Sequence, residues 1–169
     1  MRNKTAKWVA LYGMLISLAF IFSYIEAVIP IPIPVPGVKL GLANLVSIVG
    51  LYTVRISGTI AVSLVRIVLV GFTFGNLSSM IYSLAGGTVS LILMILLKKT
   101  GKFSQIGVSI IGGIGHNIGQ LTAAVLITET AGVFYYLPFL IVAGVIAGAV
   151  IGLLGGMVTD RIQNVVKWL

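Results

Sequence analysis

Apolar residues form six long runs along this chain, and short segments with charged residues, prolines or glycines separate the runs. A helix of about 20 apolar residues is long enough to cross the hydrocarbon core of a bilayer. The pattern therefore predicts six transmembrane helices, the second of them short. We expect them at residues 8–29, 39–54, 56–72, 77–97, 105–128 and 137–158. No repeat or linker interrupts the pattern, so residues 1–169 are predicted to form one transmembrane domain.

The composition agrees with a chain buried in lipid. Hydrophobic residues make up 59% of the chain, charged residues only 8%, and the mean hydropathy is +1.18. Soluble domains carry about 25% charged residues. We therefore expect an all-α integral membrane protein, folded as a six-transmembrane-helix bundle. The absence of cysteine excludes a disulfide framework, a thiolate site and haem attachment through cysteine.

The positive charges lie mostly at one end of the predicted helices. By this topology, nine of the eleven Lys and Arg residues lie on one side of the membrane, at positions 2, 4, 7, 55, 98, 99, 102, 161 and 167. Lys and Arg accumulate on the cytoplasmic side of membrane proteins. This distribution predicts that both termini are cytoplasmic. It also explains the net charge of +8 without a nucleic-acid partner.

A proline-rich segment follows the first predicted helix. Four of the five prolines alternate with aliphatic residues at positions 30, 32, 34 and 36. Proline cannot donate a backbone hydrogen bond, so this stretch can be neither a helix nor a central strand. We predict an extended outer loop over residues 30–38 that lies on something apolar. It is either a stiff hydrophobic turn at the interface or a lid over a pocket.

Polar residues interrupt the fifth apolar run between Gly112 and Gln120. The only histidine, His116, is followed by Asn117 and Gln120, and four glycines surround them. Residues three and four apart share a face of a helix, so Gln120 should neighbour both His116 and Asn117. Polar side chains inside a membrane are costly unless they face a partner or a cavity. Two interpretations remain, a polar packing contact between helices and a ligand site.

Arg66 lies well inside the third predicted helix. An arginine at the centre of a membrane helix costs at least about 2.5–3.5 kcal/mol on insertion scales. It must therefore pair with an acid or bind something. An ion pair with Glu26 or Glu129 is one possibility, and a contact with an anionic substrate is the other.

Two sets of small residues mark surfaces where helices can approach closely. Gly144, Gly148, Gly152 and Gly156 recur every four residues in the sixth run, which indicates a packing surface more than a site. The other set is a pair of small residues on the first helix, Ala6 and Ala10.

Several kinds of chemistry are missing from the sequence. The only acidic residues are Glu26, Glu129 and Asp160, and no pair has the spacing of a metal site. There is no phosphate-binding loop of the G-x-x-x-x-G-K-[ST] type. No nucleophile, base and acid set can be recognised. We therefore predict a binding protein with no catalytic residues, no metal and no cofactor.

Four motifs resemble the membrane family called "heptaprenyl diphosphate synthase component I", also known as the Gx transporter family. The motifs are Lys39–Asn44, Leu64–Arg66 with Phe74–Asn76, Ser83–Gly87 and Gly115–Gln120, and the resemblance extends over nearly the whole chain. That family is similar to the substrate-binding (S) components of energy-coupling-factor (ECF) importers. The resemblance implies a multi-pass protein of the bacterial cytoplasmic membrane, with an outward pocket capped by Pro30–Lys39. It also implies a membrane coupling protein and two ATPases as partners, with Ala6 and Ala10 as the coupling face.

These observations predict one substrate-binding set, composed of Lys39, Asn44, Arg66, Asn76, His116, Asn117 and Gln120. All of these side chains can donate hydrogen bonds, which favours a ligand with acceptor or anionic groups. The aliphatic loop favours an apolar portion, so the expected substrate is a small amphipathic micronutrient or an isoprenoid- or quinone-related precursor.

Two other functions were weighed. One is an enzyme or enzyme subunit in isoprenoid or menaquinone synthesis, and the other is a structural membrane subunit. Trans-prenyl diphosphate synthases use aspartate-rich motifs, which a single Asp160 cannot supply. A non-catalytic subunit associated with heptaprenyl diphosphate or menaquinone synthesis therefore stands as the alternative.

Overall fold

The computed structural model describes residues 2–29 and 41–166, with side chains for 6–29 and 41–163. Helices make up nearly all of this part of the chain, and it contains no strand. The elements are α1 (Arg2–Val28), α2 (Asn44–Thr53), α3 (Ile56–Thr73), α4 (Leu77–Thr100), α5 (Gln105–Thr128), the 3₁₀ helix η1 (Ala131–Tyr136) and α6 (Leu137–Val166).

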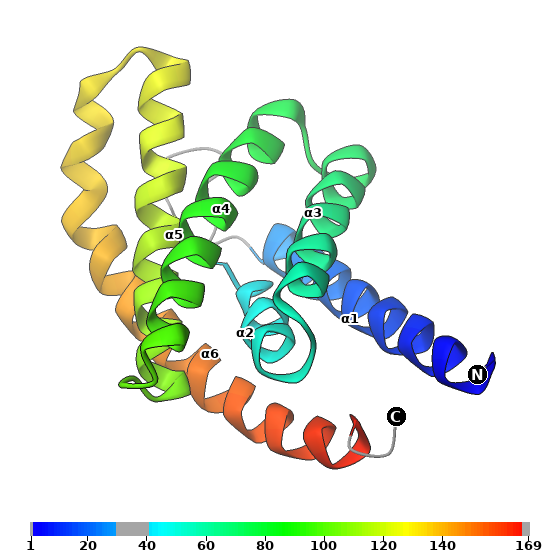
Figure 1. The fold of residues 1–169 in the computed structure, drawn as a ribbon. Coiled ribbons are helices and arrows are strands. Elements are labelled where there is room, and N and C mark those ends of the chain that lie inside the picture. Colours follow the sequence, from blue (N-terminus) through cyan, green and yellow to red (C-terminus); the bar gives the residue numbers. More distant parts are fainter. Residues whose placement is uncertain (1, 30–40, 167–169) are drawn as a thin grey trace.

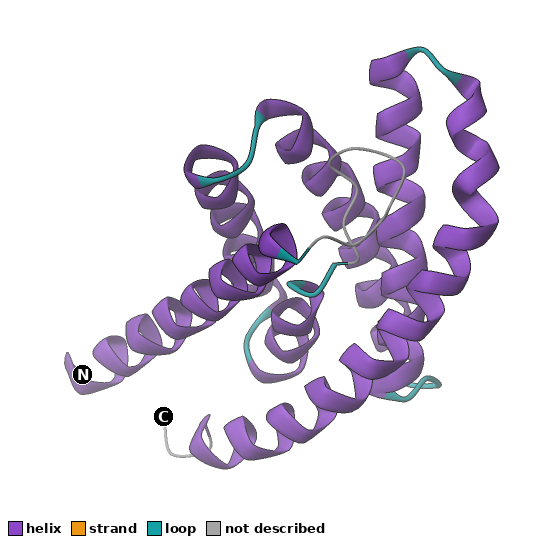
Figure 2. Ribbon diagram, turned by 180° about the vertical axis from the view of Figure 1, so that it is seen from behind, coloured by secondary structure: helices purple, strands orange, loops and turns teal. Residues whose placement is uncertain are grey.

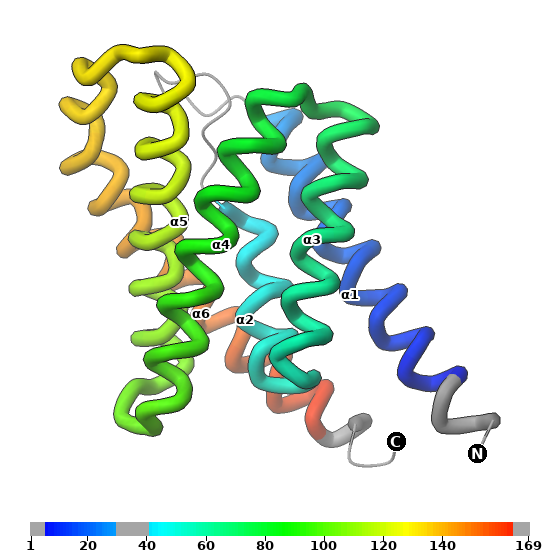
Figure 3. Tube along the Cα trace, turned by 45° about the horizontal axis from the view of Figure 1, so that its top comes forward, coloured from blue at the N-terminus to red at the C-terminus, as the bar shows by residue number. Residues whose placement is uncertain are grey.

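The helices form two groups around a central short helix (Figure 1). Helix α5 packs closely on both α4 and α6, and α1 packs on α3 on the other side. The short α2 contacts all five long helices and lies between the two groups. Both ends of the chain lie at one end of the bundle, and the turn between α5 and α6 lies at the other (Figure 3).

Five segments are long and apolar enough to cross a membrane: Ala6–Val28, Ile56–Thr73, Leu77–Thr100, Gln105–Thr128 and Ala131–Gln163. Within the described part of the chain, the structure thus gives five candidate spans in place of the six predicted.

The exception is α2, whose 10 residues extend only about 15 Å. A bilayer core is about 30 Å thick, so α2 alone cannot cross it. The predicted helix at 39–54 was too long because Gly41 adopts a left-handed φ of +84°, and helical structure begins only at Asn44.

The other predicted boundaries agree with the structure, with three extensions. Helix α1 begins at Arg2, α4 continues to Thr100 and α6 continues to Val166, because these helices run beyond their apolar segments into residues with polar side chains. The turn between α4 and α5 follows ordinary capping rules. Gly101 ends α4 in the left-handed conformation, and the Ser104 side chain accepts a hydrogen bond from the Gly107 N–H at 3.2 Å.

Glycines let α5 pack tightly on both of its neighbours. A side chain at Gly119 would meet the backbone of α4 at Ala85, and one at Gly113 would meet the α6 backbone at Gly144. The predicted glycine surface of α6 is confirmed at three positions that contact α5: Gly144, Gly148 and Gly152. Gly156 is not part of it, because no atom lies within 4 Å of the position its Cβ would take.

Membrane orientation can be tested with single cysteines, since the chain has none of its own. Lys102 lies in the exposed turn between α4 and α5, and Thr130 lies in the exposed turn after α5. Because basic residues favour the cytoplasmic side, we expect Lys102→Cys to react with an impermeant maleimide only from the cytoplasm. Thr130→Cys should react only from outside. Labelling of both from the same side would contradict the orientation.

Candidate functional site

Five buried polar side chains from four helices form what we call the polar cluster. Glu26 comes from α1, Asn44 from α2, Arg66 from α3, and His116 and Gln120 from α5, and each is at most 7% exposed. The turn before α2 lies in the centre of the molecule, beside the end of α1 (Figure 2). The polar cluster is built around this turn.

Glu26 ties the end of α1 to that turn. Its Oε1 accepts hydrogen bonds from the backbone N–H of Gly41 at 2.5 Å and of Leu42 at 3.4 Å. Glycine is needed at position 41 for two reasons, its positive φ and the space around it. A Cβ there would lie 2.8 Å from Asn44 Nδ2 and 3.2 Å from His116 Cδ2. The side chains of Asn44 and His116 therefore both lie close to Gly41.

Arg66 points into the interior of the bundle toward α1. Its Nη1 donates to Ser23 Oγ at 3.3 Å, and Ser23 Oγ donates in turn to the Ala19 carbonyl at 2.9 Å. The Arg66 charge interacts electrostatically with both Glu26 and His116. Of the two acids considered as partners from the sequence, Glu26 is the one placed near Arg66, whereas Glu129 is exposed just beyond α5.

His116 and Gln120 pair one turn apart on α5, as the spacing predicts. Their Nε2 atoms are 2.7 Å apart. With the Gln120 amide as donor, His116 Nε2 is the acceptor and Nδ1 carries the proton. Nδ1 lies beside Gly86, 3.1 Å from the position that a Cβ would take there. A Cβ at Gly86 would lie 2.6 Å from Gln120 Cγ, so the missing side chain lets α4 approach this pair.

Three polar atoms of the cluster are buried without a hydrogen-bond partner in the described part of the chain. They are Asn44 Nδ2, Arg66 Nε and His116 Nδ1. Leaving a buried polar group unpaired costs about 1–3 kcal/mol, so such atoms in a native protein point to a water, an ion or a ligand. All three can donate a hydrogen bond. The group that complements them is therefore rich in acceptors.

The structure separates Asn117 from the polar cluster. Its Nδ2 donates to the Leu140 carbonyl of α6 at 2.7 Å, and it lies against Gly144. Adjacent positions on a helix differ by about 100°, so Asn117 faces α6 whereas His116 faces α2 and α4. The expectation that Asn117 and Gln120 line one binding site stays a prediction, and in this structure the Asn117 amide is engaged by α6. Asn117 holds α5 to α6.

Asn76 also has a local structural role. It is exposed at the start of α4, where its Oδ1 accepts from Ser79 N–H at 2.8 Å while Ser79 Oγ accepts from Asn76 N–H at 3.0 Å. This reciprocal pair is a capping box. The remaining expected site residue, Lys39, and the loop 30–38 lie outside the described residues.

Two contributors to the site were not among the predicted site residues. Glu26 was considered only as a possible partner of Arg66, and Ser23 was not considered. Ser23 lies three residues before Glu26 and so shares its face of α1, a spacing that the sequence does show. No three His, Asp or Glu side chains within the described ranges lie close enough together to hold a metal ion.

Comparison with known proteins places the chain in a family. No curated protein and no solved structure matches it. The model of the family described as "Heptaprenyl diphosphate synthase component I" matches residues 15–158, which include every member of the polar cluster. This match covers well over half of the chain. The protein therefore belongs to the heptaprenyl diphosphate synthase component I family and is a multi-pass membrane protein.

Proposed function

We propose that this protein is a non-catalytic, solute-binding subunit of the bacterial cytoplasmic membrane, and specifically the substrate-binding component of an ECF-type importer. The observation that carries the proposal is the polar cluster. It places one cation and two further donors, each with an atom that has no hydrogen-bond partner among the described residues, in the interior of the bundle. Polar groups at this depth are costly and by default indicate a functional site.

The chemistry of the cluster defines the ligand class. Arg66 Nε, Asn44 Nδ2 and His116 Nδ1 can all donate to acceptor oxygens. Glu26 offsets part of the Arg66 charge, although its Oε1 already accepts from Gly41 and Leu42. A small amphipathic molecule with an anionic or acceptor-rich end fits these groups. The proposed substrates are a micronutrient of this kind or an isoprenoid- or quinone-related precursor.

The proposed partners follow from what the chain lacks. It has no phosphate-binding loop, so uptake would need ATPases from elsewhere. We propose a membrane coupling protein and two ATPases, together with lipids around the spans. Ala6 and Ala10 are both exposed on α1 and therefore available to a partner helix.

The family description favours a second candidate. The words "component I" point to a subunit that acts with another protein in heptaprenyl diphosphate synthesis, or in menaquinone synthesis downstream of it. A non-catalytic membrane subunit of that kind would hold the same amphipathic class of molecule. Copurification with a coupling protein and ATPases would favour the importer, and copurification with a soluble prenyl synthase would favour this alternative.

The test of the proposed site compares the same Arg→Gln substitution at two positions, Arg66 within α3 and Arg55 just before α3. The ligand is first identified by mass spectrometry of the purified protein. We expect Arg66→Gln to weaken its binding about ten- to a hundredfold, because a charged hydrogen bond to a buried partner is worth roughly 1.5–3 kcal/mol. His116→Ala should weaken it somewhat less.

Arg55→Gln is the matched control, since Arg55 is exposed before the first turn of α3 and should leave binding unchanged. Affinities are compared only among variants that purify as monodisperse protein. If Arg66→Gln and His116→Ala bind the ligand as tightly as the parent, the polar cluster is a packing feature and the proposed function loses its support.

A further inference from the structure

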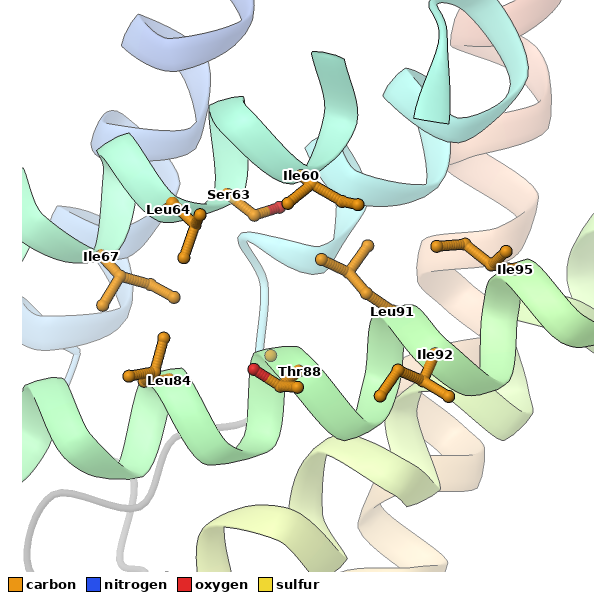
Figure 4. Close-up of a pocket in the computed structure, with 10 residues that line it drawn as sticks. Ile60, Ser63, Leu64, Ile67, Leu84, Thr88, Leu91, Ile92 and Ile95 are labelled. Atoms are coloured by element: carbon orange, nitrogen blue, oxygen red, sulfur yellow. The ribbon is translucent and has the colours of Figure 1, made fainter. Parts of the chain in front are cut away.

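A small apolar cavity, which we call the α3–α4 groove, lies between α3 and α4. Its volume is about 130 Å³. Figure 4 shows aliphatic side chains of α3 facing those of α4 across this space. The lining residues are Ile60, Ser63, Leu64, Ile67, Leu84, Gly87, Thr88, Leu91, Ile92 and Ile95.

The groove and the polar cluster lie at the same level of both helices. On α3, Arg66 points into the cluster and the next residue, Ile67, lines the groove. On α4, Gly86 packs on His116 and Gln120, and the next residue, Gly87, lines the groove. On each of these two helices, one residue therefore contacts the polar cluster and the next residue along the chain lines the groove.

Ser63 reaches from the groove toward the bundle interior. It lines the groove, and its Oγ is 3.2 Å from Ser47 Oγ on α2. Gly87 leaves room within the groove, since a Cβ there would make only an ordinary contact of 3.5 Å with Ile67 Cδ1. The groove is thus lined by one small polar side chain and one glycine at the level of the polar cluster.

The size and lining of the groove define its occupant. A cavity of about 150 Å³ holds a benzene molecule, whereas sites for whole drug-sized ligands measure about 300–1,000 Å³. The groove is therefore too small for a complete ligand and suits about six carbons of a single hydrocarbon chain. Its rim residues Leu64, Leu84 and Ile92 are 46%, 44% and 52% exposed, so it opens to the side of the bundle that would face lipid.

We infer that the protein binds a single-chain amphiphile with an oxyanion head, whose hydrocarbon chain occupies the α3–α4 groove while its head lies on the polar cluster. This inference rests on the proposed function and specifies the substrate class. The head is assigned by charge complementarity with Arg66 and the unpartnered donors. The chain is assigned by the adjacent apolar groove, which gives the ligand a lateral path from the bilayer.

The first test measures chain-length dependence with defined probes. Dodecyl phosphate, butyl phosphate and dodecanol are titrated against the protein in nanodiscs. Each methylene that enters the groove should tighten binding about fourfold, since burying one contributes about 0.8 kcal/mol. Dodecyl phosphate should therefore bind at least a hundredfold more tightly than butyl phosphate, and dodecanol should bind weakly because it lacks the charged head.

The variant Gly87→Leu places a side chain in the groove. It should reduce the affinity for dodecyl phosphate tenfold or more and leave that for butyl phosphate nearly unchanged. The matched control is Gly156→Leu on α6, where no atom lies within 4 Å of the new Cβ. Equal binding of the two phosphates, or an unchanged chain-length effect in Gly87→Leu, would overturn the assignment of the groove.

A cross-linking experiment needs no variant and so does not depend on how Gly87→Leu folds. Dodecyl phosphate with a diazirine at its chain end should label α3 and α4 within the groove, whereas the diazirine alcohol should label all lipid-facing helices. Identical labelling by the two probes would mean that the groove holds bulk lipid only. The affinity for alkyl phosphates could prove independent of chain length and still fall in Arg66→Gln. That result would reject the groove as the site of the hydrocarbon chain and leave the proposed function intact.

Discussion

Replacing Glu26 with leucine is expected to destabilise the protein by roughly 3–5 kcal/mol, while the double variant Glu26→Leu/Arg66→Met recovers much of that loss. Removing one member of a buried charge pair leaves the other charge uncompensated, whereas replacing both by apolar residues is often neutral. Glu26 and Arg66 are each 7% exposed, and their charges interact. The second substitution should therefore relieve the first.

The measurement is the free energy of unfolding in a mild detergent, followed for the two single variants and the double variant. Glu26→Gln separates two roles of this side chain, because it removes the charge and keeps an acceptor for Gly41 N–H. Glu129→Leu is the matched control, since Glu129 is exposed beyond α5. Additive effects of the two single substitutions would show that Glu26 and Arg66 do not form an energetic pair.

This pair has a consequence for binding. If Glu26 and Arg66 compensate each other in the free protein, an incoming anion competes with the carboxylate for the guanidinium. Glu26 is positioned for that exchange because its Oε1 also accepts from Gly41 and Leu42, so it keeps partners when Arg66 turns to a ligand.

Much of the helical framework could be predicted because apolar run length and capping residues determine where membrane helices begin and end. The bounds 105–128 were correct at both ends, and Gly101 and Ser104 terminate α4 and start α5 by local chemistry. The length of α2 could not be predicted from hydropathy. Its start depends on Gly41, which has a positive φ and whose N–H donates to Glu26, a residue far away in the sequence on α1.

Only part of the candidate site could be predicted from the sequence. Four of the seven predicted residues, Asn44, Arg66, His116 and Gln120, converge because buried polar groups in apolar helices gather to share partners. Asn117 was included because it adjoins His116 in sequence, although rotation along a helix turns its side chain to α6. Asn76 was counted as a donor, whereas its position before Leu77 and three residues ahead of Ser79 is typical of a helix cap.

Close packing of α5 predicts the second large effect, at Gly119. A Cβ at this position would lie 2.8 Å from the Ala85 carbonyl oxygen and 2.9 Å from Gly86 Cα. Both atoms belong to the α4 backbone, which cannot move aside as a flexible side chain can. Overpacking of this kind costs about 1–3 kcal/mol and occasionally more, so Gly119→Ala should fall in that range and Gly119→Leu should exceed it.

The matched control for this series is Gly156, which has open space around the position of its Cβ. Gly156→Ala should be neutral or raise stability by about 0.5–1 kcal/mol, because alanine is a better helix former than glycine. The free energies of unfolding of the variants decide the question, and equal values for Gly119→Ala and Gly156→Ala would refute close backbone contact between α4 and α5.

Gly119 precedes Gln120 and packs on Gly86, so its substitution separates the two helices at the polar cluster. We therefore expect Gly119→Ala to weaken ligand binding as well as stability, whereas Gly156→Ala should affect neither adversely.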